Sequence, residues 1–257
     1  MKTVILCGGR GLRLSELTDD IPKPLAKVGE FPILWHIMKI YSAYGFNDFV
    51  LALGYLGYKI KDYFLNFPKE NLRKGVSVEI LDENKIILCD GESNLKIHFV
   101  ETGEETNTGG RIKKLEKIIN EEEFMCTYGD GLAEINIKEL VKFHKSQNRI
   151  ATISIVNPLS QFGILEISNQ NIVTEFKEKP RLDHWINGGF FVFNRKIFDY
   201  LTDDSVLEKE PFENLAKERQ ISAFKLNSFW KCMDTFKDNL VLNDLWKNNK
   251  AEWKVWK

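Results

Sequence analysis

A glycine-rich segment directly follows the first apolar run of the chain. Residues Thr3 to Leu6 are apolar and partly β-branched, which predicts a strand buried on both faces. Three of the four residues at positions 8–11 are glycines, and their missing Cβ atoms let backbone N–H groups converge on a bulky anion. The same region carries three basic side chains, Arg10, Arg13 and Lys23. We therefore expect a phosphate-binding loop at the end of the first strand.

The glycine pattern differs from two common nucleotide-binding loops. The chain lacks the G-x-x-x-x-G-K-[ST] sequence of P-loop enzymes, and residues 9–14 lack the third glycine of the dinucleotide-binding fingerprint. A P-loop kinase and an ordinary Rossmann dehydrogenase are therefore disfavoured. On the loop alone, a plain βα turn with surface arginines remains an alternative, because short glycine motifs often match by chance.

The length and charge of the chain indicate which classes of protein it can belong to. At 257 residues the chain is long enough for one large α/β domain with its own core, and we expect a single domain over residues 1–257. The 36 Lys and Arg residues nearly balance 37 Asp and Glu residues, so overall charge favours neither nucleic acid nor an anionic membrane as a partner. The N-terminus resembles no signal peptide and no apolar run reaches 18 residues, which predicts a cytoplasmic protein. The four cysteines form no C-x-x-C pair, and Cys7 and Cys126 are expected to be small buried apolar residues.

The order of patterns predicts an α/β fold. A helix over 32–41 between strands 3–6 and 49–53 gives a right-handed βαβ unit, with His36 packed in the core rather than catalytic. Short strands over 77–81, 85–89 and 96–100 suggest a small antiparallel insertion. The remaining predicted helices are 59–67, 112–119, 137–146 and 236–248, and the remaining predicted strands are 124–128, 151–156, 162–167, 172–180 and 185–193.

One acidic residue stands at a predicted strand end. The strand that begins at Phe124 stops at Asp130, which has a glycine on either side. In a parallel α/β sheet the carboxyl ends of the strands carry the ligand, so Asp130 lies where a metal-bound phosphate would bind. A turn-forming Asp-Gly pair is the equally simple alternative. The loop before Arg111 offers another anion contact, and Asn187, before a glycine pair, is suited to hydrogen bonding with hydroxyl groups.

Taken together, these motifs resemble those of the sugar-phosphate nucleotidyltransferases. The resemblance extends from the first strand to the C-terminal tryptophans, and within the family it is strongest to the glucose-1-phosphate cytidylyltransferases. The segments that carry it are residues 8–14, 22–24, 32–39, 108–111, 127–131, 178–180, 186–191, 233–235 and 251–256.

The resemblance implies a fold and a reaction. The fold is a Rossmann-like nucleotidyltransferase fold, with a mixed, mainly parallel sheet, helices on both faces and small antiparallel insertions. The reaction is the transfer of a cytidylyl group from CTP to α-D-glucose 1-phosphate, which yields CDP-glucose and pyrophosphate for deoxysugar and surface polysaccharide synthesis. The family also implies Mg²⁺ as cofactor and a homo-oligomer, for which the region 77–100 is a candidate contact surface.

The resemblance also implies roles for particular residues. The catalytic residues are Arg13, Lys23 and Asp130, and the residues that hold Mg²⁺ are Asp130 and Asp234. The residues that bind the nucleotide or the sugar phosphate are Leu6, Cys7, Gly8, Gly9, Arg10, Gly11, Leu12, Thr106, Arg111, Gly129, Glu178, Lys179 and Asn187.

Four positions depart from the family pattern. Leu12 stands where the family generally has threonine, and Phe31, Leu56 and Gln161 stand where the subfamily has basic residues. These departures leave two alternatives open, a different phosphorylated acceptor and a catalytically silent relative of the family.

Overall fold

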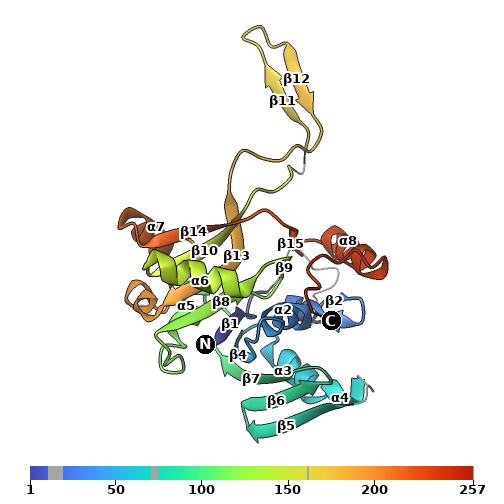
Figure 1. The fold of residues 1–257 in the computed structure, drawn as a ribbon, viewed down its shortest axis with the longest axis vertical. Coiled ribbons are helices and arrows are strands. Elements are labelled where there is room, and N and C mark those ends of the chain that lie inside the picture. The colour runs from blue at the N-terminus through green and yellow to red at the C-terminus, as the bar shows by residue number, and fades with distance from the viewer. Residues whose placement is uncertain (11–19, 71–74, 161, 257) are drawn as a thin grey trace.

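The computed structural model describes residues 1–10, 20–70, 75–160 and 162–256. Within these residues the largest sheet has nine strands, in the spatial order β14-β10-β13-β8-β1-β4-β7-β6-β5 (Figure 1). In that order the strands are Ile221–Leu226, Ala151–Val156, Ile186–Asn194, Glu123–Tyr128, Thr3–Leu6, Asp48–Leu53, Asn94–Glu101, Lys85–Asp90 and Val76–Asp82.

Three small two-stranded sheets accompany the large one. They pair β2 (Lys27–Val28) with β3 (Phe31–Pro32), β9 (Gly131–Ala133) with β15 (Trp230–Cys232), and β11 (Ile164–Ile167) with β12 (Val173–Lys177). The described helices are η2 (Lys23–Leu25), α2 (Ile33–Ser42), α3 (Gly57–Leu65), α4 (Phe67–Glu70), α5 (Thr108–Lys113), α6 (Ile137–Gln147), η3 (Arg195–Tyr200), α7 (Glu210–Lys217) and α8 (Phe236–Lys247).

The large sheet is mixed and mostly parallel, as the sequence predicts. Strand β1 is parallel to both of its neighbours, β4 and β8, and the parallel run continues to β7. Strands β13 and β6 run in the opposite direction to their neighbours. The strands predicted over 77–100 form, and they extend one edge of the sheet.

The central strands are buried on both faces. Ile5 and Leu51 belong to the core beneath α2, whereas Val4 and Val50 belong to a second core that includes residues of α5 and α7. Because side chains alternate along a strand, an unbroken apolar run is what a sheet with helices on both faces requires. The α/β layering is thereby confirmed.

The helix predicted over 112–119 differs in position from the observed one. Helix α5 begins at Thr108 and ends at Lys113, and turns follow it. The Thr108 hydroxyl accepts a hydrogen bond from the backbone N–H of Leu207 at 2.9 Å and donates one to Glu208 at 2.7 Å. These contacts with a distant segment hold the first turn in place, and no local sequence pattern encodes them.

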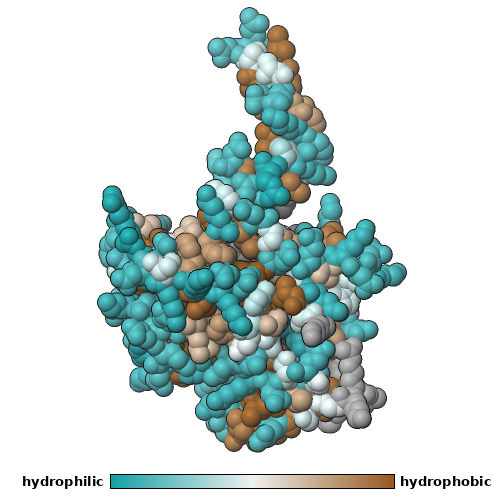
Figure 2. Space-filling view, in the orientation of Figure 1, coloured by the Kyte–Doolittle hydropathy of each residue, from teal (hydrophilic) through white to brown (hydrophobic). Residues whose placement is uncertain are grey.

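Strands β11 and β12 form an arm that projects from the body of the molecule (Figure 1). The arm is amphipathic, and its cross-strand pair Leu165 and Phe176 is 51% and 59% exposed. Figure 2 shows apolar side chains along this arm. A two-stranded hairpin with an uncovered apolar face is at best marginally stable in water.

Candidate active site

The ends of β1 and β8 bring two predicted site segments together. These strands are parallel neighbours, and Leu6 lies opposite Tyr128 in their register. Gly8 and Asp130 both follow two residues later, so the glycine loop and the acid lie at the same edge of the sheet. This is the edge where open α/β sheets bind ligands.

A second carboxylate reaches this edge through the small sheet of β9 and β15. Cys232 pairs with Gly131, and the backbone N–H of Met233 donates to the carbonyl of Asp130 at 2.9 Å. Asp234, the next residue, is thereby placed beside Asp130. The two predicted metal-ligating carboxylates are brought together.

Lys23 connects the two carboxylates. Its Nζ lies 2.7 Å from Oδ2 of Asp130 and 2.8 Å from Oδ1 of Asp234, and its side chain is 12% exposed. Burial alone would lower the pKa of Lys23, but the charge of Asp130 and hydrogen bonds to both carboxylates outweigh burial and raise the pKa to about 12. Lys23 is therefore a permanently charged group at neutral pH.

The same cluster includes a group of side chains that could hold a divalent metal ion. One potential ligand atom each from Asp130, Cys232 and Asp234 lies within 4.8 Å of the others. Carboxylate oxygens suit Mg²⁺, whereas a thiol suits softer metals. Burial raises the pKa of the Cys232 thiol. Because Mg²⁺ prefers oxygen ligands, the two carboxylates are the ligands that fit it. The ammonium of Lys23 already shows that this pair holds positive charge.

A pocket of about 500 Å³ opens beside this cluster. Its walls come from the glycine loop, from η2, from the segment that begins α5 and from the end of β8. The described residues that line it are Leu6, Cys7, Gly8, Gly9, Arg10, Lys23, Pro24, Thr106, Asn107, Thr108, Arg111, Tyr128, Gly129, Asp130 and Asp234. Most residues predicted to bind the nucleotide therefore share one cavity.

Arg111 stabilises the backbone that surrounds this pocket. Its guanidinium donates to the carbonyls of Gly8, Leu53, Gly103 and Glu104 and to the Thr102 hydroxyl, over 2.6–3.1 Å, and the residue is 4% exposed. Burial lowers its pKa, although an arginine remains charged at neutral pH. With so many acceptors, Arg111 holds the two loops of the pocket in position.

A second pocket, of about 290 Å³, meets the first at the carboxylates. The two pockets share Tyr128, Asp130 and Asp234. The Asn187 amide donates to the Tyr128 hydroxyl at 3.0 Å and accepts from the backbone N–H of Gly189 at 2.8 Å. A Cβ at Gly189 would lie 2.9 Å from the Tyr128 ring, so this glycine permits the close approach.

Several predicted site residues lie elsewhere. Glu178 and Lys179 are more than half exposed, pair with each other at 3.4 Å, and line neither pocket. Gly11, Leu12 and Arg13 lie outside the described residues.

Tyr128 and Trp230 also line these pockets, although the sequence did not predict them as site residues. Tyr128 hydrogen-bonds Glu208 as well as Asn187, and burial followed by the charge of Glu208 raises its pKa, so the hydroxyl stays protonated. Trp230 donates from Nε1 to the Gly188 carbonyl at 2.8 Å and lines the second pocket. The position of Tyr128 next to the Gly-Asp-Gly turn was the available signal for it.

A glycine loop beside two carboxylates and a lysine, at the strand ends of an open sheet, is typical of α/β enzymes that handle nucleotide phosphates. Residues 2–233 match the family described as Nucleotidyl transferase. The chain belongs to this family.

Within this family, the chain is similar to proteins with more specific names. A probable glucose-1-phosphate cytidylyltransferase of Bacillus subtilis is 45% identical, and glucose-1-phosphate cytidylyltransferase of Salmonella typhimurium is 40% identical, each over the full length of both chains. The crystal structure of HddC from Yersinia pseudotuberculosis complexed with GMP-PN has a TM-score of 0.69 at 26% identity, covering 95% of this chain and 99% of that one.

Proposed function

We propose that this protein transfers a cytidylyl group from CTP to α-D-glucose 1-phosphate and releases pyrophosphate. The observation that carries the proposal is the cluster of Lys23, Asp130 and Asp234 at the junction of two pockets. The choice of base and sugar rests on the two full-length relatives named as glucose-1-phosphate cytidylyltransferases.

The two pockets fit two phosphorylated substrates. The larger one, with the glycine loop and Arg10, is suited to the nucleotide phosphates, and the smaller one, with Asn187 and Tyr128, is suited to sugar hydroxyls. A phosphate oxygen of the sugar phosphate then attacks the α-phosphorus of CTP. The bond from that phosphorus to the bridging oxygen breaks, and pyrophosphate leaves with the electron pair.

The protein's contribution to this step is positioning and charge. In-line phosphoryl transfer needs no protein nucleophile, and an ammonium next to the reacting phosphates stabilises charge that develops on them. Lys23, whose side chain is 12% exposed, contacts both of the carboxylates that the two pockets share. Arg10, held by Glu105 and lying over the Tyr55 ring at 5.3 Å, supplies a second positive charge at the pocket wall.

Mg²⁺ is the cofactor that we propose for the carboxylates of Asp130 and Asp234. When bound, Mg²⁺ neutralises phosphate charge and fixes the geometry of the phosphates. In its presence, Lys23 would exchange its carboxylate partners for the substrate phosphates.

Two alternatives to this function, a different phosphorylated acceptor and a catalytically silent relative, can be distinguished from it by experiment. Phe31 and Leu56, which replace basic residues of the subfamily, favour a test of other phosphorylated acceptors. A silent relative would have no need for Lys23 and both carboxylates, and all three are present and in contact.

Both proposed substrates are cytoplasmic metabolites, so we place the activity in the cytoplasm, and the product would serve surface polysaccharide synthesis. No helix among the described residues combines the length and the apolar character needed to cross a membrane.

We further propose that the protein is a homo-oligomer held by its arm. The register places Leu165 and Phe176 on one face of β11 and β12, and Ile167 and Val173 pair next to them. These four apolar side chains are 51–65% exposed. The predicted contact surface at 77–100 exposes Ile80 and Leu81, whereas the arm carries the larger apolar surface. Covering it with a second copy would remove this surface from water.

Pyrophosphate release tests the reaction. With Mg²⁺ and glucose 1-phosphate, we expect release with CTP and little with UTP, dTTP, ATP or GTP. Preference for another nucleotide would overturn the base assignment. If no nucleotide supports release with glucose 1-phosphate, other sugar 1-phosphates are tested with CTP, and failure of all of them despite measurable CTP binding would indicate a silent relative.

A further inference from the structure

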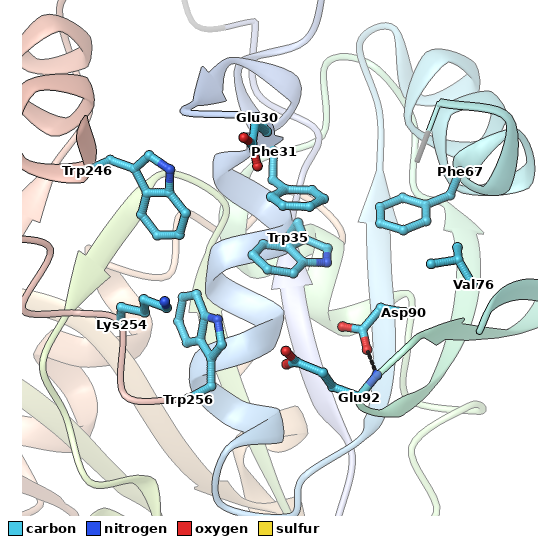
Figure 3. A pocket seen from close by; sticks show the side chains of 10 residues that line it. All are labelled: Glu30, Phe31, Trp35, Phe67, Val76, Asp90, Glu92, Trp246, Lys254 and Trp256. Atoms are coloured by element: carbon cyan, nitrogen blue, oxygen red, sulfur yellow. Dashed lines mark hydrogen bonds between the residues drawn. The ribbon is translucent and has the colours of Figure 1, made fainter. Parts of the chain in front are cut away.

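A third pocket, of about 250 Å³, lies apart from the candidate active site, and the protein's own side chains engage its walls (Figure 3). It lies between α2, the C-terminal segment and the turn that joins β6 to β7. Nζ of Lys39 contacts Asp90 at 3.0 Å and Glu92 at 2.8 Å. The same ammonium lies 5.6 Å from the ring centroid of Trp35. These contacts hold α2 against the turn, so this pocket belongs to the packing of the fold.

A carboxylate outside both pockets of the candidate active site is connected to each of them. Glu208 lies at the surface, in the turn before α7, and lines neither pocket. One of its oxygens accepts a hydrogen bond from the hydroxyl of Tyr128, and the other accepts from the hydroxyl of Thr108 at 2.7 Å. Tyr128 lines both pockets, and Thr108 lines the larger one. Glu208 therefore holds two side chains of the site from outside it.

The carboxylate of Glu208 fixes the direction of the next hydrogen bond. An ionised carboxylate only accepts, whereas a tyrosine hydroxyl has a single proton to donate. Burial and then the charge of Glu208 raise the pKa of Tyr128, so this proton stays on the hydroxyl. Because the proton is directed at Glu208, the Tyr128 oxygen accepts from Asn187, whose Nδ2 lies 3.0 Å away. Asn187 thus presents its amide nitrogen, and not its oxygen, to Tyr128.

A second contact holds the Asn187 amide in the same orientation. Its Oδ1 accepts from the backbone N–H of Gly189 at 2.8 Å. Of the two N–H groups on Nδ2, one donates to Tyr128, and the other has no partner within the described part of the chain. Since Asn187 lines the smaller pocket, this second N–H is available to an oxygen of a ligand there.

Glu208 has a weaker hold on the larger pocket. The Thr108 hydroxyl, which donates to Glu208, also accepts from the backbone N–H of Leu207 at 2.9 Å. Without the carboxylate, the bond to Leu207 still holds Thr108 at the start of α5. Loss of Glu208 should therefore affect the smaller pocket more than the larger one.

We propose that Glu208 is a positioning residue for the sugar phosphate, a role that rests on the proposed nucleotidyl transfer. Through the hydroxyl of Tyr128, it holds Asn187 with one N–H group free to donate to an oxygen of the sugar phosphate. Without the carboxylate, the Tyr128 proton has no fixed acceptor, and the Asn187 amide loses the restraint on its orientation. Glu208 lies outside both pockets, so it acts through Tyr128.

Steady-state pyrophosphate release by Glu208→Ala tests this role. The KM for glucose 1-phosphate should rise about fivefold, the effect of one ordinary hydrogen bond, while the KM for CTP and kcat change by less than about twofold. Glu208→Gln keeps an oxygen acceptor for Tyr128 and should recover most of the loss. Glu213→Ala, which removes an exposed carboxylate from α7, is the control for the change in charge and should match the wild type.

A double variant shows whether Glu208 acts through Tyr128. Tyr128→Phe keeps the ring and removes the hydroxyl, so it should raise the KM for glucose 1-phosphate to a similar extent. In the variant that combines Tyr128→Phe with Glu208→Ala, the two effects should not add, because the second change removes a partner that is already lost. Additive effects would overturn the connection between the two residues.

The kinetic outcomes separate this role from the proposed reaction. A wild type that releases no pyrophosphate with any sugar 1-phosphate would overturn the proposed function and this role with it. An active wild type whose KM for glucose 1-phosphate is unchanged in Glu208→Ala would overturn this role alone. Equal increases in both KM values would also overturn it, since Glu208 would then only maintain the fold around the two pockets.

Discussion

The guanidinium of Arg111 donates a hydrogen bond over 2.9 Å to the carbonyl oxygen of Gly8, and so joins the start of α5 to the end of β1. The contact is tight, because a Cβ at Gly8 would lie 2.1 Å from Cζ of Arg111. Gly8 is therefore required by the side chain of Arg111. Arg111 therefore shapes the glycine loop through its hydrogen bond to the backbone carbonyl of Gly8.

Gly8→Ala should destabilise the protein. Arg111 cannot move away without losing its other acceptors, so we expect a loss of roughly 1–3 kcal/mol, typical of overpacking in a filled site. Gly9→Ala is the matched control, because no heavy atom of the described residues beyond its chain neighbours lies within 4 Å of its added Cβ. Thermal unfolding compares the two variants. Equal Tm values would show that Arg111 does not constrain the loop.

Lys23→Ala should act mainly on the rate of the proposed reaction. Loss of one charged donor from the transition state lowers kcat by roughly 10²-fold or more, while the fold survives. Steady-state kinetics at saturating substrate measure the effect. An unchanged kcat with a raised KM would assign Lys23 to substrate binding alone.

Lys23→Ala should also strengthen the binding of a metal ion by the two carboxylates. Without the ammonium, Asp130 and Asp234 lose their common partner, so Mn²⁺, used as a probe in the absence of nucleotide, should bind roughly tenfold more tightly, the order expected for one partly buried ion pair. Calorimetric titration of both proteins gives the ratio. Weaker binding to the variant would mean that the metal and Lys23 occupy different places.

Asp130→Asn should abolish metal-dependent turnover and leave the protein folded. The substitution removes one ligand charge at a strand end, where the side chain is about a quarter exposed. Asp62→Asn, which changes an exposed carboxylate on α3, is the control for the change in net charge. Pyrophosphate release near the normal rate in Asp130→Asn would exclude a role for this carboxylate.

Acid should destabilise the protein through His36. Burial lowers the pKa of His36 to about 4; the side chain bonds the Val28 carbonyl through Nε2 at 2.8 Å, and Nδ1 accepts from Trp253 at 3.4 Å. A neutral native histidine that would titrate near 6.5 when unfolded contributes stability that is present above that pH and lost as the pH falls towards 4. The full loss is about 3 kcal/mol, at about 1.4 kcal/mol per pKa unit.

Urea unfolding at pH 7 and pH 4.5 tests the role of His36. The decrease in unfolding free energy should be smaller in His36→Gln than in the wild type, and His98→Gln serves as the control at a less buried histidine. If both variants lose as much stability on acidification as the wild type, His36 is not the group responsible.

Phe176→Asp should dissociate the proposed oligomer. The new charge lies in the middle of the apolar face of the arm, opposite Leu165. Glu166→Gln is the control, because Glu166 follows Leu165 in β11 and therefore lies on the other face of the arm. Light scattering should give a mass above the 29.9 kDa of one chain for the wild type and the control only. A monomeric wild type would refute the proposal.

The sequence by itself determined the local elements and the kind of chemistry. The buried strand before the glycine loop, the helix that holds His36 and the strand that precedes Asp130 follow from apolar runs, helical periodicity and glycine positions, which are short-range properties. Tertiary structure decided which of these segments meet. Asp234 reaches Asp130 through the pairing of β15 with β9, and Asn187 reaches Tyr128 across the sheet. It also left Glu178 and Lys179 outside both pockets. Strand order and register arise from the packing of the whole chain, and no local pattern of residues records them.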